Sequence, residues 1–151
     1  MKKLLVGALI VASCSSSPAK PADLVTKPAD LVTKPISVEE RAEAFDFFYE
    51  LKNHMALGEY DHFVEAAIYP MSVQVEGEPV TFSYAAELEA KFEQAFSEDA
   101  IRKFITIDES ELTFTDHGVK VADGVMWFDL VCGDPACAIA EFRITELNPS
   151  S

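Results

Sequence analysis

A proline recurs every seven residues near the N-terminus and limits which parts of this chain can form a folded domain. The segment Lys20-Pro-Ala-Asp-Leu-Val-Thr26 is repeated as residues 27–33, and Lys34-Pro35 begins a third copy. A period of seven is typical of coiled coils, but proline removes a helical hydrogen bond and clashes with the preceding turn. The repeats therefore predict an extended spacer, at most about 70 Å long over residues 15–36. A repeat that binds peptidoglycan or another partner is the alternative.

The first residues have the features of a bacterial export signal. Met1-Lys2-Lys3 is basic, and residues 4–12 are apolar or small. That run is too short to cross a bilayer, which needs about 20 residues, but it suits the core of a secretory signal. It ends in Val11-Ala12-Ser13-Cys14, which resembles the bacterial lipobox, in which the cysteine is lipidated and becomes the new N-terminus. We predict a lipoprotein signal peptide over residues 1–13; an ordinary signal peptide that contains a cysteine is the alternative.

Lipidation at Cys14 predicts attachment to a membrane through acyl chains such as palmitate. Each buried CH₂ group contributes about 0.8 kcal/mol, so several chains make a lasting anchor. Ser15, rather than Asp, follows the cysteine, which in enterobacterial-type lipoproteins implies sorting to the outer membrane. We therefore expect a lipidated spacer over residues 14–37 that holds a domain, residues 38–151, on the periplasmic side of the outer membrane.

The expected domain carries nearly all of the negative charge. The full chain has 12 Lys and Arg against 26 Asp and Glu, a net charge of −14. Residues 38–151 hold seven of these basic residues and 24 of the acidic ones, which leaves −17. Such a charge repels nucleic acids and bare anionic membranes, so we expect neither as a partner of the domain. With 49% hydrophobic and 11% aromatic residues, the chain is not a disordered acidic tail.

Periodicity predicts three helices at the start of the domain. Ser37-Val-Glu-Glu40 matches a capping box and begins a helix that should stop at Gly58. The buried stripe of this helix should comprise Ala44, Phe48, Leu51 and Met55. A second helix should end before Pro70, and Ser83 can cap a third, followed by a short turn over residues 97–104. The apolar face of that single third helix should comprise Ala85, Leu88, Phe92, Ala95 and Phe96.

Alternating apolar residues predict the strands. A short pair covers residues 71–76 and 80–82, on either side of a turn at Gly77. The later segments with period two are residues 112–115, 119–121, 125–132 and 137–147. Short turns separate these segments, which favours antiparallel neighbours. Helices followed by antiparallel strands make an α+β domain, and 114 residues suffice for a hydrophobic core.

This order of elements resembles that of the nuclear transport factor two-like superfamily, also called the cystatin-like or polyketide-cyclase-like fold. Residues 56–70, Ala-Leu-Gly-Glu-Tyr-Asp-His-Phe-Val-Glu-Ala-Ala-Ile-Tyr-Pro, resemble its second-helix region, and residues 119–128 resemble its central hairpin. The resemblance implies three N-terminal helices packed on a strongly curved mixed or antiparallel sheet that forms a cone-shaped pocket. Its members include isomerases, dehydratases, cyclases and modules that only bind, so the fold leaves the function open.

Cys132 and Cys137 flank the turn between the last two predicted strands. Export would place them in an oxidising compartment, and lipidation of Cys14 leaves an even number of thiols. We expect a disulfide that stabilises the domain by about 2 kcal/mol through loop entropy. A redox-active pair is disfavoured, because the spacing is C-x₄-C and no helix start follows to lower a thiol pKa. Free thiols are the other alternative.

Asp129 is the charged residue in an otherwise apolar segment, Val125-Met-Trp-Phe-Asp-Leu-Val131. If its face of the sheet lines the cone-shaped pocket, the carboxyl group is a buried acid suited to proton transfer, with His62 or Tyr49 as its catalytic partner. In the alternative, Asp129 lies on the outer sheet face or near a strand end and pairs with Arg143 of the adjacent strand.

Aromatic residues complete the candidate binding set, although aromatics at such spacing also serve as core. The candidate wall of the pocket consists of Trp127, Tyr49, Phe48 and Asp129. The three histidines predict no metal site, because His54 and His62 lie on opposite sides of the break at Gly58 and His117 lies in a turn. Phosphate-binding and nucleophile-elbow motifs are absent from the sequence, and we expect no cofactor.

These features lead to an expected envelope lipoprotein whose domain binds a small hydrophobic ligand or a protein without catalysis. One alternative is an enzyme, a lyase, isomerase or hydrolase of small molecules that uses the pocket carboxylate of Asp129. Another is an acidic inhibitor of a cationic envelope enzyme such as a lysozyme, since a charge of −17 would steer that association. A dimer is compatible with each of these functions.

Overall fold

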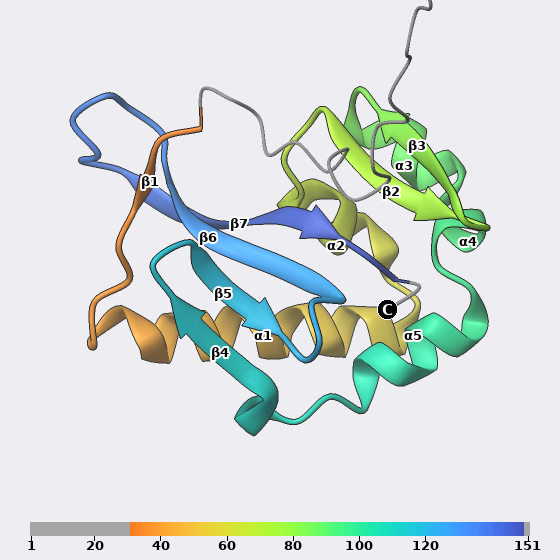
Figure 1. Cartoon of the computed structure of the whole chain (residues 1–151), viewed down its shortest axis with the longest axis horizontal. Coiled ribbons are helices and arrows are strands. Elements are labelled where there is room, and N and C mark those ends of the chain that lie inside the picture. Colours follow the sequence, from red (N-terminus) through yellow and green to blue (C-terminus); the bar gives the residue numbers. More distant parts are fainter. Residues whose placement is uncertain (1–30, 150–151) are drawn as a thin grey trace, which may run out of the picture.

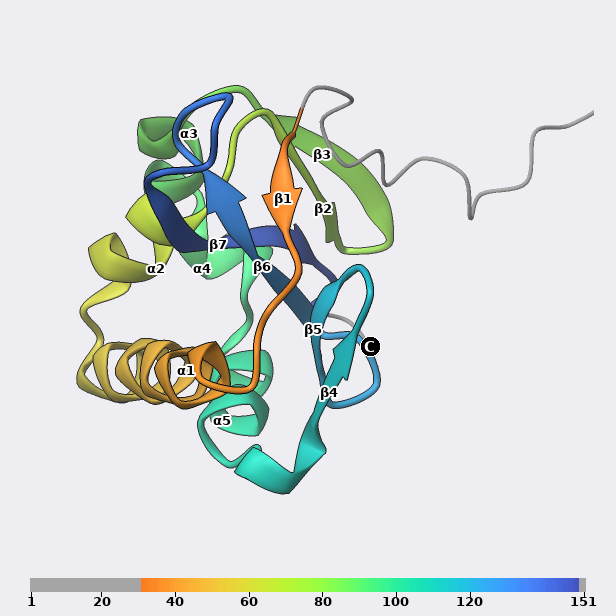
Figure 2. The same cartoon turned by 90° about the vertical axis from the view of Figure 1, so that its left-hand side faces the viewer.

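Helices cover one face of a single sheet (Figure 1; Figure 2). The computed structural model describes residues 31–149. Its helices are α1 (Glu40–Leu57), α2 (Tyr60–Ala66), α3 (Ala85–Ala90), α4 (Phe92–Ala95) and α5 (Glu98–Ile105), with a 3₁₀ turn at Glu109–Glu111. Within this range no helix is both long enough and apolar enough to cross a membrane. The predicted signal peptide, the predicted lipidation site at Cys14 and most of the predicted spacer lie outside the described residues.

Within residues 31–149, seven strands form one mixed sheet. They are β1 (Thr33–Lys34), β2 (Met71–Val75), β3 (Glu78–Phe82), β4 (Leu112–Thr115), β5 (Gly118–Val121), β6 (Met126–Cys132) and β7 (Ala140–Leu147). Their order is β3-β2-β7-β6-β5-β4, with β1 also paired to β6, and β2 runs parallel to β7. The predicted α+β class is confirmed. The sheet is neither strongly curled nor closed, so the strongly curved sheet that the resemblance implied is wrong.

The first helix forms as its sequence predicts. The hydroxyl of Ser37 accepts the N–H of Glu40, and the Glu40 carboxylate accepts the N–H of Ser37, which completes the capping box. The helix ends at Gly58, whose φ of 76° is the left-handed conformation that glycine adopts without strain. The predicted stripe is buried, namely Ala44, Phe48, Leu51 and Met55.

The single helix predicted after Ser83 is wrong, because the chain forms two shorter helices there. Lys91, with φ −120° and ψ 16°, leaves helical geometry between α3 and α4. The break lets the ring of Phe92 stack on Tyr60, with centroids 4.4 Å apart, and on Phe96 at 4.8 Å. The short turn predicted next is the helix α5, which Ser97 caps by accepting the N–H of Ala100.

Two residues of the predicted spacer belong to the sheet. The strand β1 runs antiparallel to β6, with Lys34 opposite Leu130, along the half of β6 that β5 leaves free (Figure 2). The Lys34 ammonium group also forms an ion pair with Glu40. This bond, followed by the N–H of Ser37, lowers the pKa of Glu40 from 4.5 to about 2. The end of the spacer is therefore attached both to the sheet and to the first turn of α1.

Phenylalanine rings fill the space between the helices and the sheet. Phe63 is fully buried, and its ring centroid lies 5.3 Å from that of Phe96, 5.7 Å from Phe104 and 5.9 Å from Phe92. The hollow that Phe63, Phe96 and Phe104 share with Met126 measures about 10 Å³, which is room for about one water molecule. In the described residues, the interior therefore has no space for the expected cone-shaped pocket, because large aromatic side chains occupy it.

Candidate functional site

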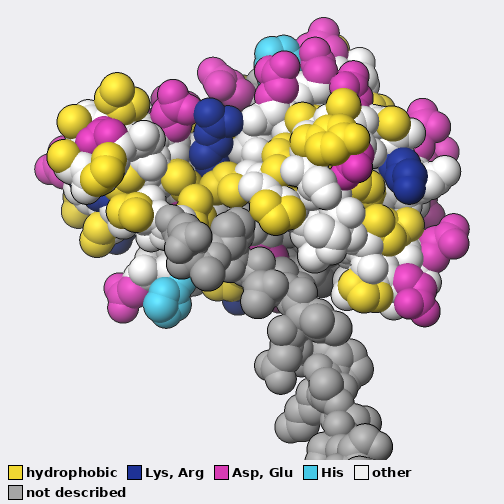
Figure 3. All heavy atoms as spheres, turned by 90° about the horizontal axis from the view of Figure 1, so that it is seen from above, with side chains coloured by type: hydrophobic (Ala, Val, Ile, Leu, Met, Phe, Trp, Pro, Cys, Tyr) yellow, Lys and Arg dark blue, Asp and Glu magenta, His cyan; other side chains and the backbone are white. Residues whose placement is uncertain are grey.

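A groove of about 390 Å³ lies at the end of the sheet where β6 turns into β7, and we call it the disulfide groove. Its volume is typical of sites that bind small ligands. The lining residues are Leu31, Ala67, Ile68, Val131, Cys132, Gly133, Ile139, Glu141 and Arg143. Figure 3 shows hydrophobic side chains gathered at the end of the molecule that holds this turn, with acidic side chains around the rest of that face. The lining is mostly apolar and includes one cation and one anion.

The position of the disulfide groove follows from strand alternation. Phe142 faces the helices, where its ring lies 5.7 Å from that of Phe47, so its neighbours Glu141 and Arg143 point to the other face of the sheet. At the edge of β7, the N–H of Ile68 donates to the carbonyl oxygen of Ile144 at 3.0 Å. This bond holds the apolar residue Ile68 beside β7, the strand that carries Glu141 and Arg143.

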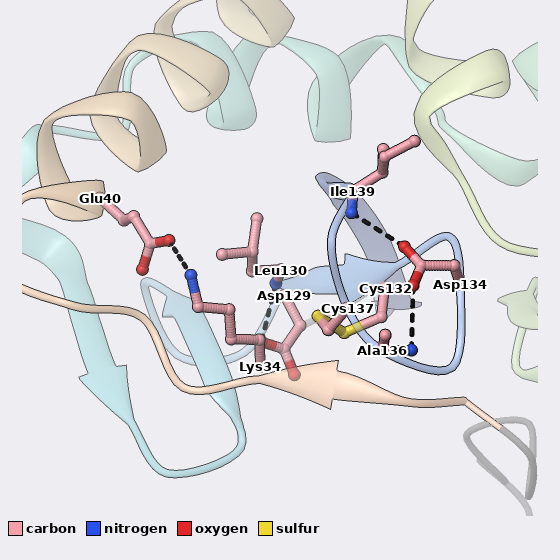
Figure 4. Close-up of a disulfide and its surroundings, with 9 residues drawn as sticks. All are labelled: Lys34, Glu40, Asp129, Leu130, Cys132, Asp134, Ala136, Cys137 and Ile139. Carbon is pink, nitrogen blue, oxygen red and sulfur yellow. Dashed lines mark hydrogen bonds and ion pairs between the residues drawn. A yellow bond between two sulfur atoms is a disulfide. The ribbon is translucent and has the colours of Figure 1, made fainter.

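The turn that forms the opposite wall is tied in two ways. A disulfide joins Cys132 and Cys137, whose Cα atoms are 4.7 Å apart, and this confirms the predicted pairing. The carboxylate of Asp134 accepts the N–H groups of Ala136 and Ile139, both at 2.9 Å (Figure 4). Backbone N–H donors, that of Ile139 first, lower the pKa of Asp134 below its usual value of 3.8. The turn therefore presents Ile139, which is 64% exposed, from an ordered backbone.

Arg143 is the cationic group of the disulfide groove. Its guanidinium donates to the carbonyl oxygen of Glu65 at 2.8 Å and to the carboxylate of Glu141 at 2.7 Å. The side chain is only partly exposed, so these two acceptors hold it in place at the surface. These bonds use two of the five N–H groups of the guanidinium, and Glu141 balances its charge. The groove therefore suits a ligand that has an apolar body and a hydrogen-bond acceptor, such as an anionic group, near Arg143.

Asp129 is buried, with 3% of its surface exposed, but it lies away from the aromatic interior. Its neighbour Phe128 faces α1, where its ring lies 5.1 Å from that of Phe47, so Asp129 points to the other sheet face. One carboxylate oxygen accepts the N–H of Leu130 at 2.8 Å, and Figure 4 shows the side chain directed towards β1. In the register it lies opposite Arg143. This is the outer-face position that the sequence offered as the alternative, and Asp129 lines none of the five hollows described for residues 31–149.

The other predicted site residues do not form one pocket wall. Phe48 is buried in the core, whereas Tyr49, its neighbour on α1, is 55% exposed. Trp127 lies beside a shallow hollow of about 200 Å³ that it shares with His117, on the sheet face away from the helices. His62 lies on α2. The structure therefore brings Asp129, His62 and Tyr49 together at no common site in the described residues.

His54 and His62, which the sequence analysis separated at Gly58, lie against each other. Their rings stack with centroids 3.7 Å apart and planes inclined by 18°. The Nδ1 atom of His54 also lies 2.7 Å from a carboxylate oxygen of Glu59. The turn at Gly58 reverses the chain, so a break in the helix brings the two histidines together instead of separating them. The sequence signal for this contact is a helix-ending glycine, Gly58, between two histidines.

The disulfide groove, the buried carboxylate of Asp129 and the histidine pair are thus three places where the described residues offer chemistry. They lie on different parts of the fold. No protein-family model, no curated protein and no solved structure matches the chain.

Proposed function

We propose that this chain is a bacterial envelope lipoprotein whose domain binds an apolar ligand in the disulfide groove without catalysing a reaction. The groove carries the proposal, because its lining is mostly apolar, a disulfide orders one wall and two acceptors hold Arg143 in place. Its volume of about 390 Å³ can hold a small ligand, whereas the aromatic interior has only about 10 Å³; two other surface hollows, of about 410 and 440 Å³, are as large but have no such ordered turn. The ligand class is an apolar molecule with an anionic group, which would lie near Arg143.

An extrinsic probe tests binding in the disulfide groove. Anilinonaphthalene sulfonate has an apolar body and one anionic group, and its fluorescence rises in apolar surroundings. We expect saturable binding that Ile139→Glu weakens at least about tenfold, because a carboxylate would enter the apolar wall. Val38→Glu is the matched control, since Val38 is also an exposed apolar residue, at 74%, and lies just before α1. Equal weakening by both variants, or by neither, would count against the groove.

Export and anchoring are supported by the sequence around Cys14 and by the disulfide, since disulfides persist in oxidising compartments. We propose that the acylated Cys14 anchors the chain in the outer membrane, with the domain facing the periplasm. Metabolic labelling of a bacterial host with an alkyne analogue of palmitate tests this. The label should be lost in Cys14→Ser and retained when Cys132 and Cys137 are both replaced by serine. Labelling that survives Cys14→Ser would overturn the anchor.

The absence of catalysis is proposed because the three candidate catalytic residues lie apart. Asp129 points away from the helices, Tyr49 lies on the surface of α1, and His62 stacks on another histidine. A general base must come within hydrogen-bond reach of the substrate together with its partner groups. Saturable turnover of any substrate that is lost in Asp129→Asn, with the fold intact by circular dichroism, would overturn this part of the proposal.

The resemblance to the nuclear transport factor two-like superfamily remains a proposal about ancestry. It is supported by the order of the elements, in which two helices precede a strand pair, further helices and then a four-strand antiparallel meander. The filled interior and a sheet that is neither strongly curled nor closed would make this chain a member without the central pocket. We infer that binding has moved from the interior to the outer edge of the sheet.

The acidic surface favours a second candidate, the inhibition of a cationic envelope enzyme. Residues 38–151 have a balance of −17, and acidic side chains are spread over the face in Figure 3. Opposite charge accelerates association and makes it sensitive to salt. Hen egg lysozyme is a suitable probe, and we expect its activity to be inhibited at low ionic strength and restored at high ionic strength. Inhibition that is independent of salt, or no inhibition, would exclude this candidate.

A further inference from the structure

We propose that His54, Glu59 and His62 bind one divalent transition-metal ion, with zinc as the reference case, where α1 meets α2. One ligand atom from each of these side chains lies within 4.8 Å of the other two. The site is separate from the disulfide groove in its residues and its chemistry. It does not depend on the proposed function.

The distances between the donor atoms are close to those that a metal requires. Zinc lies about 2.0–2.2 Å from imidazole nitrogens and carboxylate oxygens, which puts tetrahedral ligand atoms about 3.4 Å apart. His54 Nδ1 and a Glu59 carboxylate oxygen are 2.7 Å apart, and the three donor atoms all lie within 4.8 Å of one another. The two stacked rings must turn out of their nearly parallel arrangement so that both nitrogen lone pairs point at one ion, and the exposed side chains of Glu59 and His62 leave room for that rotation.

The backbone that carries these donors is fixed by the end of α1. The N–H of Glu59 donates to the carbonyl oxygen of His54 at 2.9 Å, and that of Gly58 donates to Met55 at 3.2 Å. These are the two bonds of a Schellman motif, with Gly58 in the left-handed conformation. They place Glu59 beside His54 irrespective of side-chain rotation. His62 follows within the first turn of α2, directly before the buried Phe63.

The electrostatic surroundings favour a cation. His54 lies in the last turn of an 18-residue helix, where the free carbonyl groups and the helix dipole attract positive charge. Exposed carboxylates lie one turn before His54, at Glu50, and next to and one turn after His62, at Asp61 and Glu65. The net negative charge of the domain adds to this field.

The donor types indicate which ions the site would take. Two imidazoles and one carboxylate suit zinc, copper, nickel and cobalt, whereas calcium and magnesium prefer oxygen ligands. Three protein ligands leave a fourth coordination position for water or for a side chain of a partner. The tetrahedral arrangement also gives a spectroscopic test, because cobalt(II) bound in this way absorbs strongly in the visible range.

The experiment titrates cobalt(II) and then zinc into the full chain, purified without a polyhistidine tag. We expect visible absorption that saturates at one ion per chain and that zinc displaces. His54→Ala and His62→Ala should each weaken binding at least about tenfold, and Glu59→Gln should weaken it less, because an amide oxygen remains. His117→Ala is the matched control, since His117 lies in the turn between β4 and β5, and it should leave binding unchanged.

Circular dichroism of each variant checks that the fold is retained, and all three histidines lie outside the hydrophobic core. The proposal is overturned if the wild-type chain shows no saturable cobalt spectrum. It is also overturned if the spectrum persists in the variant with both His54 and His62 replaced, or if His117→Ala reduces binding as much as these changes do.

Discussion

The disulfide between Cys132 and Cys137 allows a quantitative prediction, because it closes a short loop of known length. The perturbation is the replacement of both cysteines by serine, which leaves no unpaired thiol in the turn. For a closed loop of six residues, the loss of chain entropy in the unfolded state corresponds to about 2 kcal/mol of stability. A unit of 119 described residues has an unfolding entropy near 0.25 kcal/mol per degree, so the melting temperature should fall by about 8 °C.

Urea unfolding followed by circular dichroism measures the change in free energy, and calorimetry measures the change in melting temperature. The wild-type chain with its disulfide reduced should give the same loss as the serine variant. Asp134→Asn is the control for the turn itself, because it weakens the bonds to Ala136 and Ile139 but leaves the disulfide intact. We expect both the serine variant and Asp134→Asn to weaken binding of the fluorescent probe, since both loosen the wall that carries Ile139.

Two results would refute this reasoning about the turn. A loss below about 0.5 kcal/mol would show that the turn is equally ordered without the covalent bond. A loss above about 5 kcal/mol would show that the bond supports much more of the fold than its own loop. If the serine variant loses the expected stability but binds the probe as tightly as the wild-type chain does, the groove does not need the disulfide to bind.

Three further predictions concern the core, the sheet and the N-terminal attachment. Phe63→Ala should destabilise the domain by about 3–5 kcal/mol in urea unfolding, because it opens a cavity among three aromatic rings. Gly118→Ala should cost roughly 1–3 kcal/mol more than Gly77→Ala: both glycines have positive φ, but only at Gly118 would a Cβ atom lie 2.6 Å from a carbonyl oxygen. The bond to Lys34 lowers the pKa of Glu40 from 4.5 to about 2. The ionised carboxylate therefore stabilises the fold fully above pH 4.5, and this stabilisation is lost as the pH falls towards 2. Glu40→Gln should therefore flatten the decrease in stability between pH 4.5 and pH 2, measured by urea unfolding at each pH.

The elements predicted best are those whose signals are local. The helix α1 begins and ends as predicted because its capping box, its apolar stripe and Gly58 all act within a few residues. The strands β2, β4, β5 and β6 differ from the predicted segments by only a residue or so at their ends, since alternation and turn residues define them. The disulfide was also predictable, because Cys132 and Cys137 face each other across one hairpin turn.

The features that the sequence did not reveal depend on contacts between distant segments. The break at Lys91 goes together with the stacking of Phe92 on Tyr60, about thirty residues earlier, which no local signal near Lys91 indicates. The strand β1 exists because β6 is longer than its partner β5, and nothing within the repeat around Lys34 indicates this. Likewise, whether helices and sheet enclose a pocket depends on how far Phe63 and its neighbours fill the space between them.

The candidate site was predicted only in fragments. Strand alternation placed Asp129 correctly with Trp127 on one face, but only the packing of Phe128 against α1 showed that this face lies away from the helices. Among the residues that line the disulfide groove, Cys132 and Arg143 stand out in the sequence. The groove forms where β6, β7 and the segment after α2 meet, and such a meeting of three segments has no sequence signature.

Ligand binding in the disulfide groove is tested most directly by amide-resolved NMR of the full chain during titration with anilinonaphthalene sulfonate. We predict saturable shifts that are largest for the amides of Val131, Gly133, Ile139 and Arg143, which line the groove. Amides near the aromatic interior, such as that of Phe63, should shift little, because its hollow of about 10 Å³ cannot admit the probe. Shifts centred on the interior or around Trp127, with the groove amides unchanged, would contradict the proposed site.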